Sequence, residues 1–230
     1  MSDETPTAGE ATSDADTPSA EDGRDLTDWA GAVMAGYDGV AEAYDEDRVP
    51  DEDVQFVDSL AEALPASARV LDAGCGGGRA VLETLAAEYE TVGLDLSAEQ
   101  LALANERAPA ARLVRGDLTR LPVADDAVDG LTALHSVIHV PREHHGQVFE
   151  EFGRVLRPGG QLLLTTGVGE WEGANDDWLD SGAAMQWSFH GRERSLELLD
   201  DAGFEIRRDE VVGDELGGGE WLFVRAALEQ

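Results

Sequence analysis

One stretch of the sequence decides the fold: Val70-Leu71-Asp72-Ala73-Gly74-Cys75-Gly76-Gly77-Gly78. A short apolar strand runs into an acid, and glycines then stand at alternate positions before a helix. Glycines let the backbone turn sharply and let a ligand approach, because no Cβ atom stands in the way. Many nucleotide-binding folds have such a loop, so the loop alone predicts only a ligand site between a strand and a helix.

Two residues narrow the class of ligand. A dinucleotide-binding loop favours glycine or alanine at position 79, where this chain has Arg79. Asp72 stands just before the first glycine, and its carboxylate would repel a pyrophosphate but attract a cation. S-adenosylmethionine carries an ammonium and a sulfonium and has no phosphate, so it suits this loop.

Two further acids follow at the ends of the next strands. Asp95 ends the second expected strand, about twenty residues past the loop, where an acid can accept hydrogen bonds from both ribose hydroxyls. Asp117, in Gly116-Asp117-Leu118, ends the third. Carboxyl ends of parallel strands meet at the edge where open α/β sheets bind ligands, so these acids are expected beside the loop.

Strands and helices alternate from Arg69 onward, which predicts an α/β fold with a mostly parallel sheet and helices on both faces. Ser97 is expected to cap one helix, with Gln100 completing a capping box. The expected strands cover residues 69–71, 91–94, 112–114, 128–134, 161–166, 204–211 and 220–227. The expected helices cover residues 26–35, 51–64, 79–87, 97–109, 141–155 and 192–202.

Together these residues resemble the class I S-adenosylmethionine-dependent methyltransferases, above all the small-molecule branch that includes the quinone C-methyltransferases. The resemblance covers roughly Tyr37 to Ala227. It includes Gly93-Leu94-Asp95-Leu96-Ser97 and Arg154-Val155-Leu156-Arg157-Pro158-Gly159-Gly160. It implies a Rossmann-like seven-stranded sheet with the last strand antiparallel, S-adenosyl-L-methionine as cofactor, and methyl transfer as the activity.

The resemblance assigns the glycine loop to the cofactor. Gly74 and Gly76 would pass beneath it, and Asp72 would help place its amino-acid end. Cys75 belongs to the same loop and is expected to be a small packed residue rather than a nucleophile, since the chain has no second cysteine. Asp95 would hold the ribose.

The resemblance also assigns residues around the adenine and the methionine. Leu96 would pack on the adenine, Asp117 would accept a hydrogen bond from its amino group, and the Leu118 backbone would lie beside it. His135, after the fourth strand, would touch the methionine part. No catalytic residue is assigned.

The acceptor is expected to be a small molecule. Methyltransferases acting on adenine, cytosine or glutamine nitrogens carry Asn or Asp followed by two prolines after strand four, and this chain has Leu134-His135-Ser136-Val137-Ile138-His139 instead. A hydroxyl or an acidic carbon would need a base, for which His139 and His190 are candidates. Either histidine could equally be a packed residue.

A long segment, residues 167–191, follows the fifth strand and is expected to be a substrate lid, because long loops at strand ends often carry function. The alternative is that its aromatic residues complete a core. Tyr37 and Tyr44 could close the other side of the cofactor or pack an N-terminal helix. The segment contains Trp171, Trp178, Met185, Trp187 and Phe189.

The charge is extreme: 49 acids face 16 basic residues, all arginine, for a net charge of -33. The excess favours a protein built for very high salt, as in extreme halophiles, over an ordinary acidic protein. It also disfavours nucleic-acid partners. One cysteine permits neither an intramolecular disulfide nor a cysteine-rich metal site, and we expect no metal.

The expected domain organisation is an acidic disordered tail over residues 1–25 and a methyltransferase domain over residues 26–230, with an N-terminal helical cap at 26–66. No run of 18 apolar residues and no secretory signal is recognised, so we expect no membrane span and a cytoplasmic location. Two other functions stay open. One is a non-catalytic S-adenosylmethionine-binding protein, and the other, less favoured, is a nicotinamide-dependent oxidoreductase. The sequence does not indicate the oligomeric state.

Overall fold

The computed structural model describes residues 26–47, 51–178, 181–213 and 219–229, without the side chains of residues 41–52. The expected acidic tail, residues 1–25, lies outside this part of the chain, and so does the side chain of Tyr44. No helix within the described residues is both long enough and apolar enough to cross a bilayer.

The main sheet has the strands β1 (Arg69–Ala73), β2 (Glu90–Asp95), β3 (Arg112–Arg115), β4 (Val128–Ala133), β5 (Leu156–Gly167), β8 (Phe204–Gly213) and β9 (Glu220–Leu228). In the described part of the chain these seven strands are arranged in the order β3-β2-β1-β4-β5-β9-β8. Neighbours are parallel except that β9 runs antiparallel to both β5 and β8. The expected Rossmann-like sheet with its last strand antiparallel is therefore confirmed.

The helices are α1 (Leu26–Asp47), α2 (Asp51–Ala61), α3 (Val81–Glu88), α4 (Ala98–Arg107), α5 (His145–Val155) and α6 (Arg192–Asp201), with single turns η1 (Val137–His139) and η2 (Arg142–His144). They cover both faces of the sheet, as expected. Leu71 packs in one core with Phe149 of α5, whereas its neighbour Val70 packs in another with Leu60 of α2. Successive strand residues thus face opposite layers, as the two-residue period of a strand requires.

The strand order reverses between β1 and β4. The chain proceeds outward from β1 through β2 to β3, and then crosses to β4 and β5 on the other side. The connections after β1 and β4 therefore lead to helices on opposite faces of the sheet, α3 and α5, and leave space above the strand ends. Ligands of open α/β sheets bind at this position.

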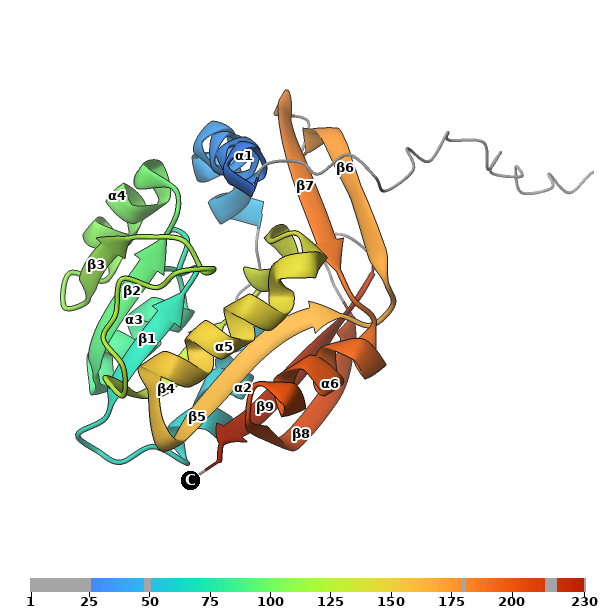
Figure 1. The fold of residues 1–230 in the computed structure, drawn as a ribbon. Helices are drawn as coiled ribbons and strands as arrows, with labels where there is room; N and C mark the ends of the chain where they lie inside the picture. The colour runs from blue at the N-terminus through green and yellow to red at the C-terminus, as the bar shows by residue number, and fades with distance from the viewer. Residues whose placement is uncertain (1–25, 48–50, 179–180, 214–218, 230) are drawn as a thin grey trace, which may run out of the picture.

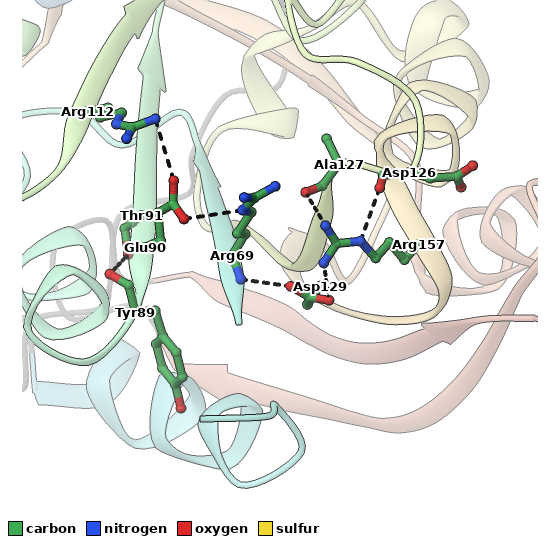
Figure 2. Close-up of polar contacts among 9 residues, drawn as sticks. All are labelled: Arg69, Tyr89, Glu90, Thr91, Arg112, Asp126, Ala127, Asp129 and Arg157. Atoms are coloured by element: carbon green, nitrogen blue, oxygen red, sulfur yellow. Dashed lines mark hydrogen bonds and ion pairs between the residues drawn. The ribbon is translucent and has the colours of Figure 1, made fainter. Parts of the chain in front are cut away.

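Charged side chains join the strands at their opposite, amino ends (Figure 2). Glu90 of β2 pairs with Arg69 of β1 at 3.2 Å and with Arg112 of β3 at 3.5 Å. Asp129 of β4 accepts a hydrogen bond from the Arg69 backbone N–H at 2.8 Å and pairs with Arg157 of β5. These contacts fix the register of five adjacent strands from the end that lies away from the crevice.

Helix α1 is longer than expected, because it continues through Gly36 and Gly39 to Asp47. Glycines usually weaken a helix, which is why the sequence suggested an end near residue 35. Here Gly36 has a packing role, since a Cβ atom on it would lie 2.4 Å from the carbonyl oxygen of Ala184. The glycine lets α1 approach the strand that carries Ala184.

The segment after β5 is a hairpin rather than an open loop, which corrects the expectation for residues 167–191. Its strands are β6 (Trp171–Trp178) and β7 (Ala183–Phe189), and they form a separate two-stranded sheet. In Figure 1 the hairpin stands beside α1, beyond the carboxyl ends of the main strands. Met185 of β7 is fully buried against Trp29 and Val33 of α1.

Candidate functional site

A cavity lies at the carboxyl ends of the parallel strands, beneath α1. It occupies the crevice at the strand-order reversal. Most of the residues expected to bind the cofactor line it: Gly74, Gly76, Asp95, Leu96, Asp117, Leu118 and His135. Residues far apart in sequence are thus brought to one hollow by the ends of β1, β2, β3 and β4.

The glycine loop after β1 is shaped by close contacts. Gly74 has a φ of 86°, and a Cβ atom on it would lie 2.2 Å from Cβ of Ser136 in the loop after β4. Ser136 in turn donates a hydrogen bond to the carbonyl oxygen of Ala73 at 2.8 Å. Only glycine combines this backbone conformation with so close an approach, so Gly74 lets two ligand loops lie side by side.

Asp95 ties the glycine loop to the end of β2. Its carboxylate accepts hydrogen bonds from the backbone N–H of Gly76 at 2.8 Å and of Ser97 at 2.9 Å. Burial raises the pKa of this carboxyl, and the backbone hydrogen bonds oppose that rise. Asp95 therefore has a fixed position in the cavity wall.

Ser97 caps α4 in part as the sequence predicts. Its hydroxyl accepts a hydrogen bond from the Gln100 backbone N–H at 3.1 Å. The reciprocal half of the expected capping box is missing, because the Ser97 backbone N–H donates to Asp95 and not to the side-chain oxygen of Gln100. The Ser97 hydroxyl also donates to Asp38 of α1.

Asp117 forms the turn that follows β3. Its Oδ1 atom accepts hydrogen bonds from the Thr119 backbone N–H at 2.8 Å and the Thr119 hydroxyl at 2.7 Å, as in an Asx turn. Leu118 beside it is 8 % exposed. Leu96 and Leu118 also line the cavity, next in sequence to Asp95 and Asp117, and add apolar side chains to its wall.

Asp72 and Cys75 lie behind the cavity wall rather than on it. Asp72 is buried and accepts a hydrogen bond from the Thr132 hydroxyl at 2.8 Å. Burial raises the pKa of Asp72 to about 7, with smaller contributions from the charges of Asp95 and Asp53. Burial likewise raises the pKa of the Cys75 thiol, which agrees with a packed thiol rather than a nucleophile.

Helix α1 forms the roof of the cavity; it belongs to the N-terminal helical cap expected at residues 26–66, in which Tyr37 and Tyr44 were the two candidates to close the cofactor side. The lining includes Trp29, Val33 and Tyr37, spaced four residues apart and therefore on one helix face. Trp29 Nε1 donates to the carbonyl oxygen of His139 at 2.9 Å, and the Tyr37 hydroxyl lies 2.7 Å from His139 Nε2. That regular spacing was the signal by which the roof could have been predicted.

The two candidate bases are placed differently. His139 lines the cavity, and its Nδ1 lies 2.8 Å from the carbonyl oxygen of Gln186 in β7. It therefore joins α1, the loop after β4 and the hairpin. His190 is not part of the cavity lining; its Nε2 lies 3.0 Å from the carbonyl oxygen of Arg142, and its ring packs on His145. The structure does not bring His190 to the site.

His135 has a strained backbone and an unexpected partner. Its φ is 51°, its backbone N–H donates to the Thr165 hydroxyl at 2.5 Å, and its Nε2 lies 3.1 Å from Asp53 Oδ1. Positive φ is uncommon outside glycine and concentrates at functional sites. Sequence reasoning missed Asp53, because nothing local links α2 to a residue 82 positions later.

The aromatic residues of the hairpin divide between two roles. Trp178, Met185 and Trp187 pack with α1 in a small core, whereas Trp171 is 45 % exposed. No described hairpin residue lines the cavity itself. The hairpin therefore packs against the roof helix from outside the cavity. Trp171 and Phe189 extend the same face of the hairpin, where the ring centroids of Trp171 and Trp187 lie 6.2 Å apart.

Comparison with known proteins identifies the family. Residues 70–160 match a family model described as a methyltransferase domain. Over 155 residues the chain is 31% identical to a protein of Encephalitozoon cuniculi with a provisional methyltransferase name; the match covers 60% of this chain and 70% of that protein. Over 119 residues it is 39% identical to 27-O-demethylrifamycin SV methyltransferase of Amycolatopsis mediterranei, covering 48% of this chain and 43% of that enzyme. The chain thus spans less than half the length of that relative.

A solved structure shares nearly the whole fold. The 1,6-didemethyltoxoflavin-N1-methyltransferase of Burkholderia thailandensis, solved with S-adenosylhomocysteine, has a TM-score of 0.73, 20% sequence identity and 94% coverage of both chains. The methyltransferase family model covers residues 70–160. This region contains the glycine loop and the acids at the ends of β2 and β3. The chain belongs to the class I S-adenosylmethionine-dependent methyltransferases.

Proposed function

We propose that this protein transfers a methyl group from S-adenosylmethionine to a small-molecule acceptor, with the cofactor held in the cavity under α1. One observation carries the proposal. A single hollow gathers the glycine loop of β1, Asp95 and Leu96 of β2, and Asp117 and Leu118 of β3. That set offers carboxylates for hydroxyl and amino donors next to apolar surface for a flat base, which is what a nucleoside requires.

The adenosine end would lie between β2 and β3. Asp95 would accept hydrogen bonds from the ribose hydroxyls, and Leu96 would pack on the adenine. Asp117 would accept from the adenine amino group, with Leu118 beside it. The two carboxylates at these strand ends suit a ligand that is rich in hydrogen-bond donors, because a carboxylate can only accept hydrogen bonds.

The amino-acid end would lie across Gly74 and Gly76, toward His135. Asp72 sits behind this loop and supplies a negative charge for the ammonium and the sulfonium. Cys75 would contribute backbone alone, since its thiol is packed away from the hollow.

When bound, the cofactor supplies an activated methyl group for direct displacement. The residues of this chain align the acceptor with that methyl and exclude water. Trp29 and Val33 of α1, both buried, provide the apolar roof that excludes water. Tyr37 and His139 provide polar groups at the same roof.

A small acceptor is supported by the names of relatives. The rifamycin and toxoflavin methyltransferases are named for small molecules. The hairpin formed by β6 and β7 would hold the roof over the acceptor, with Trp171 at its outer edge. Replacing Trp171 by alanine should lower turnover and leave S-adenosylhomocysteine affinity unchanged.

The test is methyl transfer itself. The protein is incubated at molar potassium chloride with S-adenosylmethionine labelled in its methyl group and a panel of small hydroxyl, amine and thiol acceptors. Label in any acceptor, with matching release of S-adenosylhomocysteine, supports the proposal. Tight cofactor binding with no transfer to any acceptor would favour a non-catalytic binding protein instead.

A further inference from the structure

We infer that the methyl acceptor is a flat, uncharged ring compound, and that it binds on a row of four aromatic side chains next to the cofactor cavity. This aromatic row consists of Trp221 of β9, Phe189 and Trp187 of β7, and Trp171 of β6. The inference rests on the proposed methyl transfer and deepens it, because it names the class of the acceptor and the residues that would recognise it.

Three members of the row share one face of the hairpin. Trp171 pairs with Phe189 across the hairpin, and Gly173 pairs with Trp187. Directly paired residues of an antiparallel sheet place their side chains on the same face. The ring centroid of Trp171 lies 6.0 Å from that of Phe189 and 6.2 Å from that of Trp187. The three rings therefore form one continuous apolar surface.

The fourth member extends the row onto the main sheet. Trp221 pairs with Gly167 of β5, and a Cβ atom on Gly167 would lie 1.9 Å from the Phe189 ring. Phe189 therefore occupies the space where a side chain at position 167 would stand. Its ring centroid lies 5.7 Å from that of Trp221, so the row continues from β9 to the hairpin.

Two histidines connect the row to the cavity, because His135 and His139 both line it. The ring centroid of His135 lies 5.7 Å from that of Trp221, and the ring centroid of His139 lies 5.7 Å from that of Trp187. No member of the row lines the cavity, so a cofactor in the cavity does not need to cover the row. An acceptor on the row would lie beside the methionine end of the cofactor, which is proposed to point toward His135.

The row is partly open to solvent. Trp171 is 45 % exposed, and the other three members are half-buried. Among the described residues, only Trp171 and Val211 are large apolar side chains exposed to this degree. An exposed tryptophan that continues into three further rings marks a binding surface, because soluble proteins ordinarily cover contiguous apolar area of this kind.

The row carries no charge, although 49 of the 230 residues are acids. The six hairpin residues that pair on this face are Trp171, Gly173, Asn175, Met185, Trp187 and Phe189. The opposite face carries Glu172, which accepts a hydrogen bond from Ser188 and pairs with Arg142. A charged acceptor would lose water on the row without gaining a partner, so the row favours an uncharged ring.

A glycine sets the position of the exposed ring. A Cβ atom on Gly173 would lie 2.6 Å from Cζ2 of Trp171, so the Trp171 ring lies across the backbone of Gly173. Glycine inside a strand often marks such a close approach. Alanine at position 173 would displace the ring without removing it, which allows the position of the ring to be tested apart from its presence.

Binding of ring compounds is measured on the full-length protein saturated with S-adenosylhomocysteine at molar potassium chloride. The probes are 2-naphthol, its saturated analogue decahydro-2-naphthol, and 2-naphthoate at neutral pH. The chain has five tryptophans, so ¹⁵N-labelled indoles give five N–H signals, each assigned from the variant that replaces that tryptophan by phenylalanine. Trp29 lines the cavity and reports on the cofactor. Trp171, Trp187 and Trp221 report on the row.

We expect S-adenosylhomocysteine to shift the Trp29 signal, and 2-naphthol to shift the signals of the three tryptophans of the row. 2-Naphthol should bind at least about fivefold more tightly than the saturated alcohol, because only a flat ring stacks on aromatic side chains, and at least about fivefold more tightly than 2-naphthoate. Equal affinity for the three probes, or shifts confined to Trp29, would overturn the inference. Absence of S-adenosylhomocysteine binding would contradict the proposed function, and the inference with it.

Three variants locate the bound ring: Trp171→Ala, Gly173→Ala and, as a matched control, Gly169→Ala. A Cβ atom on Gly169 would meet no atom within 4 Å, so this control makes the same change in the same segment without displacing a ring. Trp171→Ala and Gly173→Ala should each weaken 2-naphthol binding by at least about fivefold and leave S-adenosylhomocysteine affinity unchanged. Gly169→Ala should bind both as the wild type does. Unchanged 2-naphthol affinity in Trp171→Ala would overturn the inference.

A second copy of the chain is the other occupant that an apolar face of this kind could take, and light scattering at the protein concentration of the titration tests it. We expect the same mass for the wild type and for Trp171→Ala. A dimer that becomes a monomer in Trp171→Ala would assign the row to an interface between copies and overturn the inference.

Discussion

The hydroxyl of Tyr37 lies 2.7 Å from Nε2 of His139, although 102 residues separate them in sequence. The bond joins the roof helix α1 to the loop after β4, and both residues line the cavity. Trp29 donates to the backbone of the same histidine. Two hydrogen bonds from α1 to one residue, His139, therefore help to hold this helix over the site.

Tyr37→Phe should lower the free energy of unfolding by about 1–2 kcal/mol, because the variant removes the donor that satisfies a buried imidazole. Denaturant unfolding at constant potassium chloride measures this. Tyr89→Phe is the control, since the Tyr89 hydroxyl makes only a long 3.4 Å contact to the Ala61 carbonyl oxygen. An equal loss of unfolding free energy in the two variants would show that the bond between Tyr37 and His139 does not stabilise the fold.

Cofactor binding should release a proton from Asp72. Burial raises the pKa of Asp72 to about 7, so near pH 6 the free protein holds this group largely protonated. A bound cation favours the carboxylate and lowers that pKa. Calorimetry at pH 6 in two buffers of different ionisation enthalpy should detect the release. S-adenosylmethionine should release more than S-adenosylhomocysteine, which lacks the sulfonium charge.

The control for that release is Asp72→Asn, which keeps the shape of the side chain and cannot titrate. Its binding heat should be the same in both buffers after correction for dilution. Release that persists undiminished in this variant would assign the proton to another group.

His145 should make stability depend on pH. Burial lowers the pKa of His145 from 6.5 to about 4, and its Nδ1 has no hydrogen-bond partner among the described residues. Between these pH values the unfolded chain binds the proton and the folded chain does not. The contribution of neutral His145 to the free energy of unfolding is therefore complete above pH 6.5. It is lost as the pH falls toward 4, and the loss is roughly 3 kcal/mol.

The contribution of Asp72 to the free energy of unfolding changes with pH in the opposite direction, because burial raises the pKa of this group in the folded protein. The contribution of His145 is therefore isolated by comparing the wild type with a variant that lacks His145. The free energy of unfolding of the wild type minus that of His145→Gln should fall steadily from pH 6.5 to pH 4. The adjacent His144→Gln serves as the control for loss of a histidine. A difference that does not vary with pH would refute the assignment.

Part of the site could be predicted from sequence because its signals are local. Asp95 and Asp117 each end a strand that its own apolar residues define, and parallel strands bring their ends to one edge. The glycine loop is a contiguous motif. Asp53 could not be found this way, since its place depends on how α2 packs over the sheet.

The hairpin was missed because its first strand lacks the usual pattern. Trp171–Trp178 contains Gly173, Asn175 and two aspartates, residues that disfavour strands. The second strand did carry a signal, since Met185, Trp187 and Phe189 alternate. Tertiary contact with α1 and pairing between the two strands outweigh the weak propensity of the first.

The stability of the protein should rise with salt. The sequence carries 49 acids and only 16 basic residues. The excess acids repel one another over a Debye length of about 10 Å at 0.1 M salt and about 3 Å at 1 M. Melting temperatures measured across this range of potassium chloride should climb steeply. A sucrose series of matched osmolality separates screening from solute exclusion, and a flat salt series would argue against adaptation to high salt.

The most direct measurement is calorimetric titration of the protein with S-adenosylhomocysteine and, separately, with NAD, at molar potassium chloride. S-adenosylhomocysteine should bind, and Asp95→Ala should weaken its affinity by about a hundredfold or more, because two hydrogen bonds to a charged acceptor are each worth about 1.5–3 kcal/mol. The exposed acid Glu99 of α4 gives the matched control, Glu99→Ala, which should bind as the wild type does. Tighter binding of NAD than of S-adenosylhomocysteine, or an unchanged affinity in Asp95→Ala, would contradict a cofactor site built on the ends of β1, β2 and β3.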